Sequence, residues 1–163
     1  FAEQVFPSLK KVDSSLKLYI VGSNPTETVQ SLEKISGVCV TGRVLDVRPY
    51  LKFAAAAVAP MRVARGIQNK VLEAMAMAKP VIVTPQALEG IAAEHGQDVL
   101  VADDEAALGA LVEQVLAGQF SSIGKTAREK VTRDFSWDDN LPNVTSWLED
   151  GRASVSGGAG HEV

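Results

Sequence analysis

The chain has 163 residues, of which 46% are hydrophobic and 22% charged, the composition of one folded globular domain. A net charge of -4, from 16 Lys and Arg against 20 Asp and Glu, argues against nucleic acid as the main partner, since no basic stripe with aromatic residues is present. No uncharged apolar stretch reaches the roughly 20 residues of a membrane-spanning helix. The single cysteine, Cys39, cannot form an internal disulfide, and its apolar neighbours predict a small buried side chain.

Apolar periodicity and turn residues predict helices and strands in alternation along the chain. A first helix is expected over residues 1–12, with Pro7 kinking or ending it. The other expected helices span residues 24–35, 45–53 with Pro49 in its first turn, from Gly66 to a stop at Lys79 and Pro80, 106–117 and 123–135. The expected strands span residues 16–22, 38–44 (a strand together with its exit loop), 54–60, 80–84 and 98–102. Residues 136–139 resemble a further helix start, and residues 151–163 form a Gly- and Ser-rich tail that is expected to be disordered.

This alternation predicts an α/β, Rossmann-like fold in which a parallel sheet is covered by helices on both faces. In such a fold ligands bind beyond the carboxyl ends of the strands, near the helix N-termini. The loops that leave the strands should therefore lie along one edge of the sheet. They include Gly22, Gly42 with Arg43, and residues 61–66 and 84–90.

The helix after the third of these loops has two distinct faces. Ile67, Val71 and Met75 recur every four residues and predict its buried face. Lys70 and Glu73, together with Gly66, fall on another face.

Two cations stand where that helix starts. Unpaired N–H groups already make this end positive, so Arg65 and Lys70 would be unfavourable there unless an anion binds. The alternative is that Lys70 pairs with Glu73 and that Arg65 is a solvated loop residue.

Several common ligand motifs are absent from the sequence. It contains no Gly-x-Gly-x-x-Gly after a strand and no Gly-x4-Gly-Lys-Ser/Thr phosphate loop. The two histidines, His95 and His161, have no Cys or acidic companions at ligand spacing, so no metal site is expected.

Residues 66–83 follow the pattern Gly-x3-Lys-Val-Leu-Glu-Ala-Met-Ala-x2-Lys-Pro-Val-x-Val. This pattern resembles the donor-site motif of retaining GT-B glycosyltransferases of family 4 (glycosyl transferases group 1). The sequence of residues 65–73 is most similar to that of sugar transferases of bacterial exopolysaccharide and PEP-CTERM/exosortase systems. The resemblance covers about residues 1–150, including residues 19–22, 40–44, 59–60, 89–90 and 96–101.

The resemblance implies that residues 1–150 are most of a C-terminal, nucleotide-sugar-binding domain, whose first strand and partner acceptor domain would precede residue 1. It implies that Glu73 binds the donor ribose and that the amides near Gly66 and Ile67 approach the diphosphate. Arg43, Arg65 and Lys70 are the further candidate contacts to the donor. The family is usually metal-independent, so neither a metal nor another cofactor is expected.

One departure concerns the donor. Arg65 stands eight positions before Glu73, where the family usually has a first acidic residue, which leaves the identity of the sugar open. The expected activity is transfer of a sugar from a nucleoside-diphosphate sugar to a glycan or lipid-linked acceptor in polysaccharide biosynthesis. We expect the transfer reaction to take place in the cytoplasm, a location that includes the inner face of the membrane. The alternative is a non-catalytic Rossmann-like nucleotide-binding or regulatory module.

Overall fold

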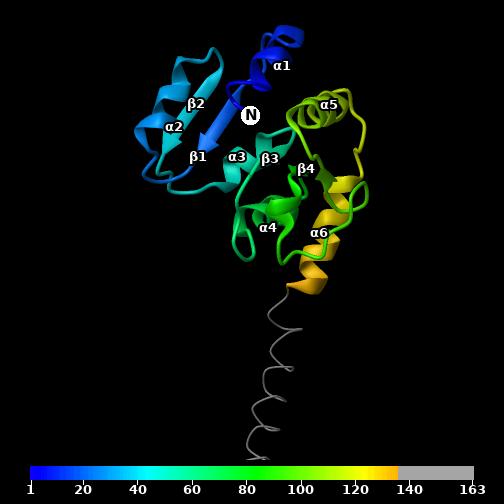
Figure 1. The fold of residues 1–163 in the computed structure, drawn as a ribbon. Coiled ribbons are helices and arrows are strands. Elements are labelled where there is room, and N and C mark those ends of the chain that lie inside the picture. The colour runs from blue at the N-terminus through cyan, green and yellow to red at the C-terminus, as the bar shows by residue number, and fades with distance from the viewer. Residues whose placement is uncertain (136–163) are drawn as a thin grey trace, which may run out of the picture.

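The computed structural model describes residues 1–135, which form short helices around two small parallel sheets (Figure 1). The α-helices are α1 (Phe6–Val12), α2 (Glu27–Ser31), α3 (Arg48–Phe53), α4 (Asn69–Ala76), α5 (Glu105–Leu116) and α6 (Ile123–Asp134). The strands are β1 (Leu18–Val21), β2 (Val38–Gly42), β3 (Ala57–Ala59), β4 (Val81–Val83) and β5 (Leu100–Val101). Short 3-10 helices span Leu32–Lys34 and Pro85–Leu88. The expected helix start at 136–139, the domain end at 150 and the tail at 151–163 lie outside the described residues.

The strands pair in parallel, as the sequence predicted, but in two sheets rather than one. The first sheet pairs β1 with β2, and the second has the order β3-β4-β5. In the second sheet Val58 lies beside Ile82, which lies beside Leu100. Each strand is shorter than its predicted segment, because pairing with a neighbouring strand extends over only part of that segment.

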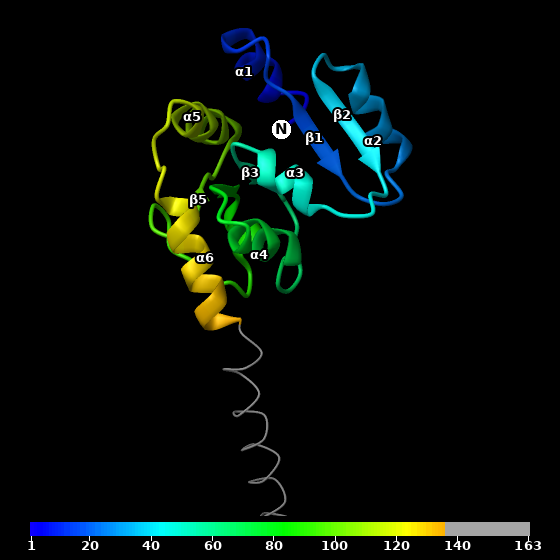
Figure 2. The same cartoon turned by 180° about the vertical axis from the view of Figure 1, so that it is seen from behind.

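The second sheet separates two hydrophobic cores, because successive side chains of a strand point to opposite faces. Val81 and Val83 of β4 pack with α4 and α6, whereas Ile82 packs with α1 and α5. All three side chains are at most 1% exposed, since β4 has a strand on each side and helices on each face. Figure 2 shows α4 and α6 lying together, apart from α5 and α1. This is the doubly covered, Rossmann-like arrangement that the sequence predicted.

Proline positions explain where two helices begin. Pro7 and Pro49 both stand in the first turn of their helices, where no amide donor is required. The prediction for Pro49 is confirmed. The prediction that Pro7 kinks or ends a helix over residues 1–12 is wrong, because α1 starts at Phe6.

Two further predictions about the first sheet need correction. Cys39 is only partly buried, because β2 is covered less completely than the strands of the second sheet. The helix expected over residues 24–35 is instead a single short helix followed by a 3-10 turn. Thr26 caps its start by accepting a hydrogen bond from the Val29 amide at 3.4 Å.

Candidate functional site

The loop between β3 and α4 differs from the sequence prediction at its start. Gly66 does not open the helix, because its φ of +66° is left-handed and α4 begins only at Asn69. Gln68 takes the N-cap position in an extended conformation. The predicted shared helical face therefore holds Lys70 and Glu73 but not Gly66.

Gln68 braces this loop, a role that the sequence analysis missed. Its side-chain Nε2 donates to the carbonyl oxygen of Gly66 at 2.9 Å and to that of Arg65 at 3.3 Å. Both carbonyl groups are thereby turned toward Gln68. A polar residue just before a helix that lacks a Ser, Thr, Asp or Asn cap was the available signal.

The consecutive amides of residues 66–70 form the central feature of the site. Within residues 1–135, none of these five N–H groups donates to a backbone or side-chain acceptor. The first intrahelical bond is made by Val71, whose N–H donates to the Gln68 carbonyl at 2.9 Å. A run of free donors at the positive end of a helix is suited to bind an anion.

The charged side chains beside these amides are also free. Arg65, Lys70 and Glu73 are exposed, and within residues 1–135 their side chains form no hydrogen bond or ion pair. The alternative in which Lys70 pairs with Glu73 is therefore not what the structure contains. Val71, Ala74 and Met75 are fully buried on the other side of α4, so the free charges face away from the core.

The prediction that Ile67 belongs to the buried helix face is wrong. Ile67 precedes α4, and its side chain is 49% exposed. It lies instead over Gly90 in the loop that follows β4, where an added Cβ would stand 2.9 Å from the Ile67 Cγ1 atom. Ile67 thus joins the exit loops of β3 and β4.

Other contacts also connect the strand-exit loops, as the sequence predicted for the edge of a parallel sheet. The Thr84 hydroxyl, just after β4, donates to the Met61 carbonyl after β3 at 2.6 Å. Arg62 forms a 2.9 Å ion pair with Glu105 at the start of α5, which follows β5. The loops after β3, β4 and β5 therefore form one continuous rim.

Arg43 occupies a different part of the molecule from the other candidates. It is exposed in the turn after β2, next to the left-handed Gly42, which lies beside Val21 of β1. Within residues 1–135 it forms no hydrogen bond or ion pair. The structure therefore brings together Arg65, Gly66, Ile67, Lys70 and Glu73, but it does not connect Arg43 to them.

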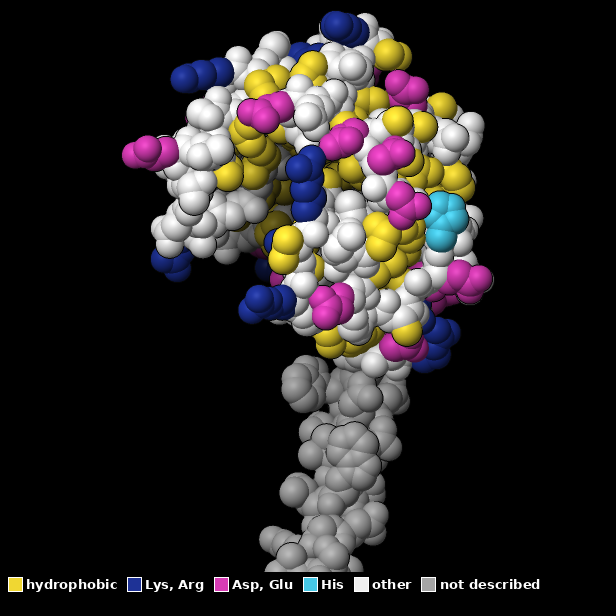
Figure 3. Space-filling model, in the orientation of Figure 1, with side chains coloured by type: hydrophobic (Ala, Val, Ile, Leu, Met, Phe, Trp, Pro, Cys, Tyr) yellow, Lys and Arg dark blue, Asp and Glu magenta, His cyan; other side chains and the backbone are white. Residues whose placement is uncertain are grey.

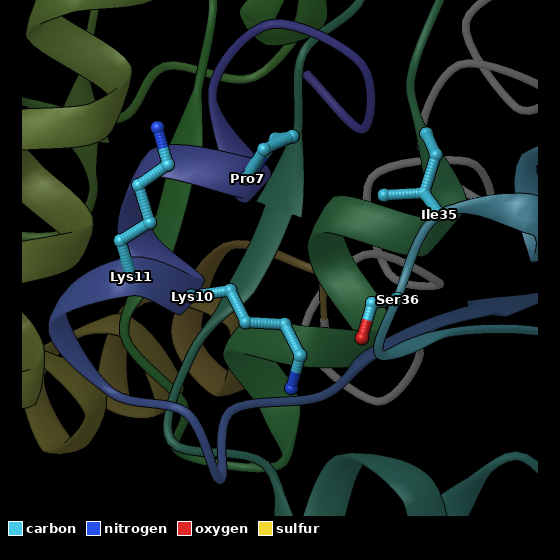
Figure 4. Close-up of a pocket in the computed structure, with 5 residues that line it drawn as sticks. All are labelled: Pro7, Lys10, Lys11, Ile35 and Ser36. Carbon is cyan, nitrogen blue, oxygen red and sulfur yellow. The ribbon is translucent and has the colours of Figure 1, made fainter.

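A shallow pocket of about 190 Å³ lies elsewhere, between α1 and the turn before β2 (Figure 4). Lys10 is its central cation, but the Lys10 Nζ atom already donates to the carbonyl groups of Ser14 at 2.7 Å and Leu16 at 3.0 Å. Lys11 points away from Lys10 in Figure 4. This pocket offers no group comparable to the free amides before α4.

The described surface also carries charged and metal-ligating side chains outside this site. Figure 3 shows Lys and Arg side chains dispersed among acidic ones on the face in view, without a continuous basic stripe. Residues 1–135 contain no group of three or more His, Cys, Asp or Glu residues placed to hold a metal ion. In the same residues, no helix has the length and apolar character needed to cross a bilayer.

The fold and the rim define a Rossmann-like α/β domain with free amide donors at the start of α4. Comparison with protein families identifies this domain further: residues 1–118 match the family described as Glycosyl transferases group 1. The chain belongs to this family. No curated protein matches the chain significantly.

Solved structures share the fold at low sequence identity. Sucrose-phosphate synthase from Thermosynechococcus elongatus matches 94% of the chain with a TM-score of 0.71 and 20% identity. TarM matches 90% with a TM-score of 0.70 and 17% identity, and a glycosyltransferase from Rickettsia africae ESF-5 matches 90% with a TM-score of 0.66 and 17% identity. The chain spans 44%, 30% and 43% of the lengths of these three structures, respectively.

Proposed function

We propose that this chain is the donor-binding domain of a retaining glycosyltransferase that takes a sugar from a nucleoside diphosphate. The observation that carries the proposal is the run of five free amides at residues 66–70, flanked by Arg65 and Lys70. A diphosphate placed there would accept hydrogen bonds from the amides and would offset the charges of both cations. Membership of the glycosyl transferases group 1 family supports the same ligand.

The role of Glu73 in this proposal is to hold the ribose of the donor. Glu73 is the fifth residue of α4, about one turn beyond Asn69, so its carboxylate is within reach of a ligand at the helix start. An ionised carboxylate accepts hydrogen bonds from hydroxyl groups and donates none, which suits a pair of ribose hydroxyls. Its exposure and lack of a partner within residues 1–135 leave both oxygens available.

The leaving diphosphate gains negative charge as the glycosidic bond to the donor breaks. Arg65, Lys70 and the positive end of α4 would stabilise that charge without a metal ion. A separate acceptor domain of the same protein would supply the other side of the cleft. The proposed product is a glycan or lipid-linked sugar of a polysaccharide pathway, made in the cytoplasm or at the inner face of the membrane.

The proposal is tested by calorimetric titration of the protein with UDP, GDP and the corresponding nucleotide sugars. We expect Glu73→Gln and Lys70→Met each to weaken binding of the preferred nucleotide by about tenfold, since a charged hydrogen bond contributes about 1.5–3 kcal/mol. The two variants should differ in their affinity for inorganic pyrophosphate, which has no ribose. We expect Lys70→Met to weaken pyrophosphate binding and Glu73→Gln to leave it unchanged.

Matched controls are available on other helices. Glu113 is an exposed carboxylate on α5, and Lys125 is an exposed cation on α6. Glu113→Gln and Lys125→Met should leave nucleotide affinity unchanged. Equal affinity of the parent protein, Glu73→Gln and Lys70→Met for every nucleotide would reject this site.

A further inference from the structure

We infer that the Glu33 carboxylate closes the outer edge of β2 against edge-to-edge pairing with a second copy of this chain. The first sheet pairs β2 with β1, and within residues 1–135 no strand pairs with the other side of β2. Figures 1 and 2 both place β2 between β1 and α2, so β2 is the outer strand of this sheet. An edge strand presents a row of backbone groups with which another chain can pair.

The composition of this edge favours such pairing. Residues 35–42 contain no charged side chain, and β2 itself has the sequence Val-Cys-Val-Thr-Gly. β-Branched residues and a low local charge are typical of segments that pair edge to edge. Natural proteins protect edge strands with a charged residue or a proline in the strand, or with a neighbouring element that covers the edge. Because β2 contains neither a charge nor a proline, its protection has to come from a neighbouring element.

The backbone of β2 directs alternate residues toward β1 and toward the outer edge. The Leu18 amide donates to the Gly37 carbonyl at 2.9 Å, so Gly37 faces β1. In a parallel ladder alternate residues bond to the same neighbour, which places Cys39 on that side too. The intervening residues, Val38 and Val40, therefore direct their N–H and C=O groups to the outer edge, where a second strand would pair with them.

Both outward amides already donate to groups that precede β2. The Val38 amide donates to the Ile35 carbonyl at 3.0 Å, a backbone bond of the turn that leads into the strand. The Val40 amide donates to the Oε1 atom of Glu33 at 3.1 Å. The second bond lies in the middle of the strand and depends on a single side chain.

The far end of the edge is closed by an irregularity in the strand. Gly42 has a left-handed φ of +64°, and the register of β1 against β2 shifts between Ile20 and Val21. The Gly42 carbonyl accepts a hydrogen bond from the Thr41 hydroxyl at 2.9 Å. Since a bulge interrupts regular pairing, Val40 is the central position at which another strand could pair with this edge.

Glu33 is held beside this position by the element that covers β2. It lies in the 3-10 helix Leu32–Lys34, which packs against β2, and within residues 1–135 its exposed side chain forms no ion pair. An ionised carboxylate accepts hydrogen bonds and donates none, so it satisfies the Val40 N–H. An approaching strand would have to place a carbonyl oxygen where the carboxylate stands, and two copies would bring two like charges together.

A second copy fits this edge because the edge can pair with itself. A two-fold interface joins the same patch on both molecules, and antiparallel pairing of identical strands meets that condition. With Val40 of one copy opposite Val40 of the other, each N–H would donate to the carbonyl of its partner. Both bonds require the amides that Glu33 occupies.

The test combines sedimentation velocity with residue-resolved amide hydrogen exchange over a roughly 100-fold range of protein concentration. We expect Glu33→Ala to form a dimer whose share rises with concentration. Its Val40 amide should exchange faster than that of the parent protein in dilute solution. Once the dimer has formed, this amide should exchange at least about tenfold more slowly than in dilute solution.

Two variants separate the hydrogen bond from the loss of charge. Glu33→Gln should sediment like the parent protein, because its amide oxygen can still accept from the Val40 N–H. Glu113→Ala removes one exposed carboxylate from α5 and changes the net charge by the same amount, so it should also remain unchanged.

Val40→Pro in the Glu33→Ala background tests the geometry of the edge. Proline has no N–H and is tolerated on an edge strand where that group points away from the sheet. The double variant should therefore sediment like the parent protein. Association that persisted in it would not use the Val40 amide and would overturn the inference.

The inference would also be overturned if Glu33→Ala sedimented like the parent protein at every concentration. Association of Glu33→Ala without slower exchange at Val40 would have the same meaning, because the contact would then lie elsewhere. A loss of stability without association would show that Glu33 serves only the turn before β2. None of these measurements requires a nucleotide, so their outcome is independent of the proposed donor site.

Discussion

Gly124 at the start of α6 packs directly against the carbonyl group of Ala78, just beyond the end of α4. A Cβ atom on Gly124 would overlap the Ala78 carbonyl oxygen and stand 3.3 Å from the Lys79 carbonyl carbon. These atoms belong to the backbone and cannot turn aside as a flexible side chain could. The close approach of α6 to the end of α4 therefore requires glycine at this position.

We predict that Gly124→Ala destabilises the protein by about 1–3 kcal/mol, because the added methyl group forces α6 away from α4. Chemical denaturation measures this change. Gly109→Ala is the matched control, since Gly109 is also helical and its added Cβ would meet only the Val5 Cγ1 atom at 3.4 Å. Glycine weakens a helix interior, so this control should be neutral or more stable by up to about 1 kcal/mol. Equal effects of the two variants would contradict the packing argument.

Lys79 has a structural role that its place in the sequence motif did not reveal. Its Nζ atom donates to the carbonyl groups of Lys52 at 2.6 Å and Ala54 at 3.0 Å, at the end of α3. We predict that Lys79→Met lowers the free energy of unfolding by about 1–3 kcal/mol, because charged hydrogen bonds are lost. Lys52→Ala should cost less, because the Lys52 carbonyl remains and only its exposed side chain is removed. Thermal and denaturant unfolding measure the free energies of unfolding of the two variants. If Lys79→Met were as stable as the parent protein, the two Lys79 hydrogen bonds would not contribute to stability.

Gln68 is predicted to act on ligand affinity by holding the loop rather than by touching the ligand. Gln68→Ala releases the carbonyl groups of Arg65 and Gly66 and should weaken nucleotide binding by about 3- to 10-fold, with little change in unfolding free energy since the side chain is near the surface. Gln68→Glu should be at least as harmful, because a carboxylate cannot donate to either carbonyl. Calorimetry with UDP and GDP tests both variants. If Gln68→Glu bound as well as the parent, the two side-chain bonds would have no part in binding.

The pKa of Asp46 gives a prediction about pH. The Arg48 guanidinium, and then the Arg48 amide, hold the pKa of the Asp46 carboxyl below its ordinary value. The resulting stabilisation is fully present above the pKa of the unfolded chain and is lost as the pH falls through the lower folded value. A carboxyl-carbon NMR titration should show the Asp46 pKa rising toward its ordinary value in Arg48→Met, since the amide contribution remains. Arg128→Met should not move it, and an unchanged Asp46 pKa in Arg48→Met would contradict the assignment.

Local sequence determined the elements whose signals lie within a few residues. The alternation of apolar runs and turns fixed the α/β class, and Pro49 marked the first turn of α3, since a proline tolerates that position and few others. The core face of α4 followed from the spacing of Val71 and Met75, both fully buried. Those signals depend on helix and strand periodicity alone, so no distant contact was needed to read them.

Tertiary contacts decided the remainder. Periodicity extended the buried face of α4 to Ile67, but the left-handed Gly66 delays the helix to Asn69 and places Ile67 over Gly90, 23 residues further along the chain. The charges of Lys70 and Glu73 suggested either an ion pair between them or a ligand-binding site. Only the fold shows that, within residues 1–135, their side chains form no ion pair with each other. Sequence spacing records which residues can be neighbours on one element. Which of them remain free for a ligand depends on how separate elements pack.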